Sequence, residues 1–244
     1  MVSPVPVLLI HAVRTSRTMW RHQTQTLSRA GIPSLALDLP GHGERREGRF
    51  TLDGAVEAVR DGVDRLGGRA LVVGLSLGGY VAIEHRARHP EQSAGLVAAS
   101  CSTPPATRLR DAWIVAARWI ERWPDQGERL NEAVVGLSLP ADAAADLAAG
   151  GYALTVMSDV LREVGSIDTF ASLAAATSPV WIVNGRYDHF RTGERAMLAA
   201  ARSSGARARL VVVPHARHTV SLDAPVAFDR VLLEAVATVS RGAR

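Results

Sequence analysis

The sequence predicts an α/β fold: a doubly wound, mainly parallel sheet of about six strands, with helices on both faces and a helical lid insertion. Three observations lead to this prediction. Short apolar runs recur along the chain, segments with helical spacing separate most of them, and one long interval contains helix-like segments only. Because strand and helix alternate, we expect parallel strands joined by right-handed crossovers.

Six apolar runs are the predicted strands. Each has four to six residues with little alternation, which is typical of strands that helices cover on both faces. Residues between them have helical spacing, as Val56, Val59 and Val63 illustrate. The predicted strands are residues 5–10, 34–37, 70–75, 95–100, 179–184 and 208–213.

The interval between the fourth and fifth runs contains no convincing strand. We therefore expect residues 1–102 and 177–244 to form the core, and residues 103–176 to form the lid insertion. A helix early in this interval carries Trp113 and has apolar residues on two sides, and a later helix carries Met157 on its apolar stripe. We expect these two side chains to contact an apolar substrate; burial of both faces of the first helix is the alternative.

The composition limits the possible functions. With 244 residues, 47% of them hydrophobic, the chain is long enough for one sizeable core. It has no apolar stretch of about 18 residues and no recognisable signal peptide, so we expect a cytoplasmic protein. All 28 basic residues are arginine, which excludes Schiff-base chemistry and Ser-Lys dyads. The net charge of +4 is scattered, so neither nucleic acid nor a membrane is an expected partner. The oligomeric state stays open.

Metal and dinucleotide chemistry find no support in the sequence. The single cysteine, Cys101, cannot form an internal disulfide, and no cluster of histidine, cysteine or acidic residues has metal-ligand spacing. The residues after the first predicted strand are His11-Ala12-Val13-Arg14, which lack the Gly-x-Gly-x-x-Gly pattern of a dinucleotide site. We expect no cofactor.

Ser76 is the candidate nucleophile. It lies in Gly74-Leu75-Ser76-Leu77-Gly78, between a predicted strand and a predicted helix. A serine needs a base to take its proton, and a sharp strand-to-helix turn exposes the hydroxyl to such a base. Glycines two residues before and after the serine are required there, because side chains would collide across the turn.

The chain resembles the α/β-hydrolase superfamily, in particular its lid-bearing serine esterase and peptidase-like branch. Four ordered segments carry the resemblance: 8–12, 38–43, the Ser76 turn, and a late aspartate and histidine. The superfamily order of nucleophile, acid and histidine implies Asp188, which follows the fifth strand, as the acid. For the base it implies His218, with His215 as the alternative, since only the spacing to Asp223-Ala224-Pro225 separates the two.

The resemblance also implies an oxyanion hole made by the backbone amides of Leu77 and Val13. Here the sequence departs from the family pattern, because Ala12 stands where the family has glycine. Alanine does not reach positive φ angles easily, so we expect a shifted or narrower oxyanion loop. Arg14 and Arg17 follow this loop; binding of an acidic substrate group is one interpretation, but surface arginines are the favoured one. We expect His85 on a helix surface.

These residues predict a carboxylesterase-like serine hydrolase that cleaves an ester or thioester of a small, largely apolar substrate through an acyl-enzyme. The alternative is a non-hydrolytic protein of the same fold, such as a cyclase, a lyase or a small-molecule binder of secondary metabolism, and the altered oxyanion loop is its motive.

Overall fold

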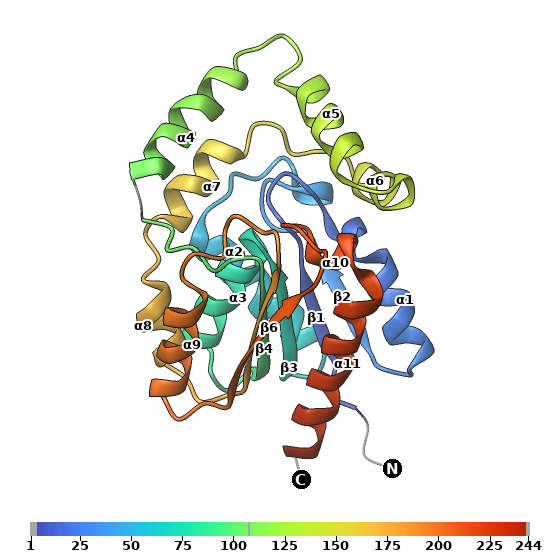
Figure 1. Cartoon of the computed structure of the whole chain (residues 1–244), viewed down its shortest axis with the longest axis vertical. Helices are drawn as coiled ribbons and strands as arrows, with labels where there is room; N and C mark the ends of the chain where they lie inside the picture. The colour runs from blue at the N-terminus through green and yellow to red at the C-terminus, as the bar shows by residue number, and fades with distance from the viewer. Residues whose placement is uncertain (1–3, 107, 243–244) are drawn as a thin grey trace.

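Six parallel strands form one sheet in the computed structural model, which describes residues 4–106 and 108–242 (Figure 1). The extreme ends of the expected core, and residue 107 of the expected insertion, lie outside these ranges. The order of strands across the sheet is β2-β1-β3-β4-β5-β6. The predicted fold class is therefore confirmed. The strands are β1 (Val7–Ile10), β2 (Ser34–Leu37), β3 (Ala70–Leu75), β4 (Ser93–Ala99), β5 (Val180–Gly185) and β6 (Ala208–Val213).

Helices cover both faces of the sheet. One face packs on α2, α3 and α9, and the other packs on α1 and α11. The alternation along β1 shows the two layers: Leu8 and Ile10 belong to the first core, whereas Val7 and Leu9 belong to the second. The α-helices are α1 (Arg21–Arg29), α2 (Leu52–Arg65), α3 (Leu77–Arg88), α4 (Arg108–Ile120), α5 (Glu128–Ser138), α6 (Ala141–Ala148), α7 (Met157–Val164), α8 (Thr169–Ala174), α9 (Glu194–Ser203), α10 (Val220–Asp223) and α11 (Pro225–Gly242); two short 3-10 helices are η1 (Arg17–Trp20) and η2 (Gly43–Arg45).

Side-chain caps fix where two of these helices begin. The Thr51 hydroxyl accepts a hydrogen bond from the Gly54 amide at 3.1 Å and starts α2. The Asp168 carboxylate accepts one from the Ala171 amide at 3.0 Å and starts α8. Such caps satisfy amides that have no partner inside the helix, and each stabilises its helix by about 1 kcal/mol.

Five helices, α4 to α8, lie between β4 and β5. In Figure 1, α4 to α7 stand above the sheet, whereas α8 lies lower and packs on α3 and α9. On α4, Ala117 is buried, but Trp113 and Trp119 are 55% and 61% exposed. The alternative in which both faces of this helix are simply buried is therefore wrong. Within the described residues, no helix is both long enough and apolar enough to cross a membrane.

The second half of α3 contains three buried polar residues, Glu84, His85 and Arg86. His85 is fully buried, so its expected place on a helix surface is wrong; α3 lies between the sheet on one side and α2 and α8 on the other. Arg86 is also fully buried, and its guanidinium donates to the carbonyls of Leu173, Ala176 and Ser178 and to the Ser178 hydroxyl. Burial lowers the pKa of Arg86 to about 10. These bonds fix the chain between α8 and β5.

Candidate active site

Ser76 lies at the turn between β3 and α3 with φ 54° and ψ −112°, a left-handed conformation that non-glycine residues rarely adopt. Its amide donates to the Ala99 carbonyl at the end of β4, at 2.8 Å. A Cβ atom on Gly74 would lie 2.0 Å from the Gly78 carbonyl oxygen, and one on Gly78 would lie 2.3 Å from the Ile10 carbonyl oxygen. The turn therefore excludes side chains at both glycine positions.

Three of the predicted side chains meet at the carboxyl edge of the sheet. The Nε2 atom of His218 lies 3.1 Å from the Ser76 Oγ, and its Nδ1 atom lies 3.1 Å from an oxygen of Asp188. His215, the alternative base, is exposed and has φ 60°. The structure thus brings Ser76, His218 and Asp188 together in one hydrogen-bonded row.

Contacts between two loops set the distance from Asp188 to His218. The Arg186 and Tyr187 amides, which follow β5, donate to carbonyls of Val213 and Ala216 after β6, both at 2.9 Å. Gly185 is needed at this junction, because a Cβ there would lie 2.1 Å from a backbone oxygen of the other loop. The close approach of the loops places the carboxylate beside the imidazole.

Asp188 is held in its ionised form. Burial alone would raise its pKa, but the hydrogen bond and charge of His218, the Phe190 amide at 2.8 Å and the Ser100 hydroxyl together lower it. A carboxylate only accepts hydrogen bonds, so the Nδ1 atom of His218 carries the proton and donates it to Asp188. The Nε2 atom of His218 is then the acceptor for the Ser76 hydroxyl.

Val13 and Leu77 line the same cavity as Ser76 and His218. Among the residues that the structure describes, neither amide donates to a protein acceptor. Ala12 is not left-handed; the residue with positive φ in this loop is Arg14, at 63°. The loop therefore holds Ala12 without a positive φ, and its left-handed residue is Arg14.

His11 fixes the start of this loop. Its Nδ1–H donates to the Ala12 carbonyl at 2.7 Å, and its Nε2 accepts from the Leu39 amide at 3.0 Å. Only a neutral imidazole can donate a hydrogen bond from one ring nitrogen and accept one at the other. Burial, assisted by the neighbouring His42, lowers the pKa of His11 to about 3, which keeps the ring neutral.

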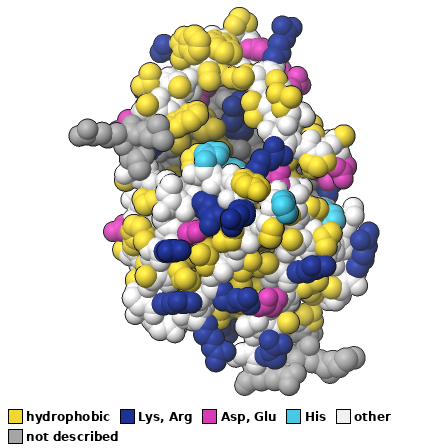
Figure 2. Space-filling model, viewed as in Figure 1, with side chains coloured by type: hydrophobic (Ala, Val, Ile, Leu, Met, Phe, Trp, Pro, Cys, Tyr) yellow, Lys and Arg dark blue, Asp and Glu magenta, His cyan; other side chains and the backbone are white. Residues whose placement is uncertain are grey.

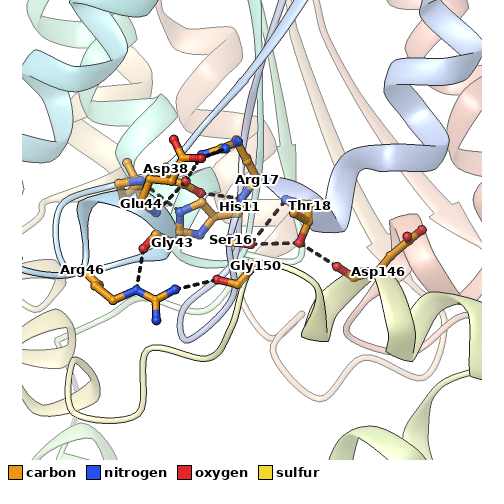
Figure 3. A network of polar contacts seen from close by, with 11 residues as sticks. His11, Ser16, Arg17, Thr18, Asp38, Gly43, Glu44, Arg46, Asp146 and Gly150 are labelled. Atoms are coloured by element: carbon orange, nitrogen blue, oxygen red, sulfur yellow. Dashed lines mark hydrogen bonds and ion pairs between the residues drawn. The ribbon is translucent and has the colours of Figure 1, made fainter.

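A polar network ties the loop after β1 to its surroundings (Figure 3). The Arg17 guanidinium pairs with Asp38 and Glu44, so Arg17 serves the structure of the loop after β2. The Thr18 hydroxyl donates to the Asp146 carbonyl at 2.6 Å, and Arg46 donates to the Gly150 carbonyl at 3.1 Å. These two bonds attach the helices above the sheet to the loops below them.

An apolar cavity of about 360 Å³ opens above Ser76. Figure 2 shows this side of the molecule hollowed between the upper helices and the sheet, with histidine and arginine side chains at the hollow. Trp113 and Met157 both line the cavity, together with Val160, Leu161 and Val164 of α7. Since Trp113 is more than half exposed, it stands at the mouth of the cavity.

Tyr80 and Phe190 are among the lining residues that were missed in the sequence. Tyr80 lines the cavity and its hydroxyl donates to the Thr103 carbonyl at 2.5 Å; its position one helical turn after Ser76 is a signal that could have identified it. Phe190 also lines the cavity, and its ring centre lies 5.0 Å from that of His218. No pattern distinguished Phe190 in the sequence. In the part of the chain that the structure describes, no three metal-binding side chains gather.

Comparisons with known proteins agree with this architecture. The model of the alpha/beta hydrolase family matches residues 7–231. The chain is 38% identical over 96 residues to Lipase LipV of Mycobacterium tuberculosis, covering 38% of this chain and 36% of the lipase. It is 36% identical over 107 residues to the pimeloyl-[acyl-carrier protein] methyl ester esterase of Neisseria meningitidis, covering 43% and 39%. These matches span little more than a third of each relative.

A carboxylesterase structure from Nitrososphaera gargenis superposes with a TM-score of 0.80 at 17% identity, covering 98% of this chain and 92% of that one. At this identity the likeness shows the fold alone. The family model, by contrast, matches almost the whole chain, and its match agrees with the observed sheet. The chain belongs to the alpha/beta hydrolase family.

Proposed function

We propose that this protein is a serine hydrolase that cleaves an ester or thioester of a small, largely apolar substrate. The observation that carries the proposal is the hydrogen-bonded row of Ser76, His218 and Asp188 at the floor of an apolar cavity. The partial matches to a lipase and to a methyl ester esterase support ester chemistry.

In the proposed reaction, His218 takes the proton of the Ser76 hydroxyl through Nε2 as the oxygen attacks the substrate carbonyl. The carbonyl oxygen becomes an oxyanion, and the amides of Leu77 and Val13 donate to it. His218 then returns the proton to the departing alkoxide or thiolate, which leaves an acyl group on Ser76. A water molecule, deprotonated by the same imidazole, releases the acid and restores the hydroxyl.

Asp188 has a separate part in this mechanism. Its carboxylate accepts from Nδ1–H, holds the reactive tautomer of His218, and stabilises the imidazolium that forms during attack. Its lowered pKa keeps it ionised when the histidine is neutral as well as when it is charged. We assign substrate contacts to Trp113 at the mouth of the cavity and to Met157 on its wall. Residues 103–176 form the lid in this proposal.

The test is hydrolysis of 4-nitrophenyl butanoate by the Ser76→Ala variant. We expect activity to fall by roughly 10³-fold or more, because the nucleophile is lost. Ser203→Ala is the matched control, since this exposed serine bonds only to its own helix. Activity in Ser76→Ala equal to that of the control would refute the proposal.

A fluorophosphonate probe separates hydrolysis from the non-hydrolytic alternative. An activated serine is labelled by the probe, so the proposal predicts labelling of the folded protein and none of Ser76→Ala. The reason to consider a non-hydrolytic protein is Ala12 in the oxyanion loop. Because Ala12 does not have a positive φ, this reason is weakened. A cytoplasmic location stays part of the proposal, and cell fractionation tests it.

A further inference from the structure

Arg14 lies directly beside the proposed oxyanion hole. It follows Val13 in the chain, and its own carbonyl accepts from the Ala153 amide, in the approach to α7, at 3.2 Å. Its left-handed backbone, with φ 63°, is uncommon for a residue with a side chain. Arg14 is therefore the residue through which the loop after β1 is bonded to the segment before α7.

The guanidinium of Arg14 has two buried nitrogens without an acceptor. Among the described residues, no side chain or backbone oxygen is hydrogen-bonded to its Nε or its Nη2. The favoured expectation of a surface arginine is wrong for these atoms. Because an unpaired buried N–H of a charged group costs several kcal/mol, such a group usually has an acceptor, which the protein, an ordered water or a ligand supplies.

The two nitrogens form one edge of the guanidinium, and that edge fits a carboxylate. Elsewhere in this chain the same edge does bind one. The Nε and Nη2 atoms of Arg49 lie 3.0 and 3.1 Å from the two oxygens of Asp159. The same atoms of Arg191 bind Glu194 at 3.0 and 2.7 Å. Two parallel bonds of this kind are the strongest arrangement that arginine makes with a planar anion.

No carboxylate of the described residues pairs with this edge. Burial lowers the pKa of Arg14, and the negative charge of Glu121 opposes the shift. Glu121 itself accepts hydrogen bonds from the amide and the hydroxyl of Ser158, both at 3.3 Å. Glu121 therefore attracts the Arg14 guanidinium by its charge, while its carboxylate oxygens are hydrogen-bonded to Ser158 of α7.

We propose that Arg14 binds a carboxylate of the substrate, so that the preferred esters carry an acidic group on their acyl or alcohol part in addition to the apolar portion. Both carboxylate oxygens accept from the Nε–H and Nη2–H edge. Because both nitrogens are buried in this structure, binding requires the groups that cover them to move. This inference rests on the proposed ester hydrolysis and adds the charge of the substrate to it.

The kinetic test compares matched esters. The acyl pair is 4-nitrophenyl hemisuccinate and 4-nitrophenyl butanoate, and the alcohol pair is 4-carboxyphenyl butanoate and phenyl butanoate. We expect kcat/KM to favour the charged member of at least one pair by about tenfold to a hundredfold. Arg14→Gln should reduce that preference to about one, and Arg14→Lys, which keeps the charge but loses the fork, should restore it only in part.

Arg29→Gln is the control for net charge, because it removes an equally positive but exposed side chain at the end of α1. It should leave the preference unchanged. Equal kcat/KM values for charged and neutral esters in both pairs would overturn the inference. So would a preference that survives in Arg14→Gln.

A binding measurement keeps this inference separate from the reaction. Succinate monomethyl ester is titrated calorimetrically into Ser76→Ala and into Ser76→Ala with Arg14→Gln added. We expect affinity to fall at least tenfold in the double variant, with both proteins folded by circular dichroism. If no ester is hydrolysed by the unaltered protein, the proposed function fails, and the titration alone decides the role of Arg14. Equal affinities in the two proteins would refute that role.

Discussion

Acidification to about pH 5 should destabilise this protein by about 4 kcal/mol relative to about pH 8, because two histidines are buried in their neutral form. Burial lowers the pKa of His11 from 6.5 to about 3 and that of His85 from 6.5 to about 4. A lowered histidine pKa means that the unfolded chain binds more protons than the folded one below pH 6.5. The stability is therefore complete above pH 6.5 and decreases as the pH falls toward the folded values.

The magnitude follows from the pH interval. From 6.5 down to about pH 5, each histidine costs about 1.4 kcal/mol per pH unit, which gives about 2 kcal/mol for each. Burial also lowers the pKa of His42, which acts in the same direction. Asp188, whose pKa is lowered from 3.8, loses its contribution only at more acidic pH. Histidines alone therefore dominate this interval.

Urea unfolding at about pH 8 and about pH 5 measures the effect. In His85→Gln, which cannot titrate, the loss of unfolding free energy should shrink by about 2 kcal/mol. His215→Asn is the control, because His215 is exposed and asparagine tolerates its positive φ. The reasoning is refuted if His85→Gln and the unaltered protein lose the same free energy on acidification.

Four further variants test other parts of the structure. Asp188→Asn keeps the shape of the side chain but loses the charge, so kcat for 4-nitrophenyl butanoate should fall by roughly 10³-fold or more; a loss under tenfold would contradict its assigned part. Arg86→Met leaves buried carbonyls without donors and should lower the unfolding free energy by about 3 kcal/mol or more in urea titrations. An unchanged urea midpoint would show that the hydrogen bonds of Arg86 to the chain between α8 and β5 are dispensable. Gly78→Ala should abolish or strongly destabilise folding because its Cβ would meet the Ile10 carbonyl, whereas Gly136→Ala, in α5 with open space around it, should stabilise by about 0.5–1 kcal/mol; thermal melts that rank the two the other way would contradict the geometry.

The sequence was most informative where the signal is local. The turn around Ser76 needs only adjacent residues: an apolar strand, two glycines without room for a side chain, and an apolar, buried start to α3. The six strands were predicted for the same reason, since each is a short apolar run; β1, β3, β4 and β5 are buried throughout, whereas the edge strands β2 and β6 are only partly buried. The order of Asp188 and His218 came from resemblance to a family, and spacing alone favoured His218 over His215. The catalytic parts of these residues stay predictions.

Burial by distant segments was the part that the sequence did not reveal. His85 has the neighbours of a surface residue, and only the packing of α8 and α2 onto α3 encloses it. Arg14 is similar, because its place in a loop did not reveal that two of its guanidinium nitrogens are buried or that the distant Ala153 amide donates to its carbonyl. The sequence also did not reveal that Arg14, and not Ala12, has a positive φ in this loop.

Most of the apolar wall above Ser76 comes from one uninterrupted stretch between β4 and β5, whereas Ser76, Asp188 and His218 lie on three separate loops of the sheet. One continuous stretch of the gene therefore encodes most of the apolar wall. Recombination could exchange that stretch without changing the loops that carry Ser76, Asp188 and His218. The boundary of such an exchange should lie before α8, because this helix packs on α3 and α9, which cover the sheet. A graft that ends at Gly165 would replace α4 to α7 and leave that layer intact.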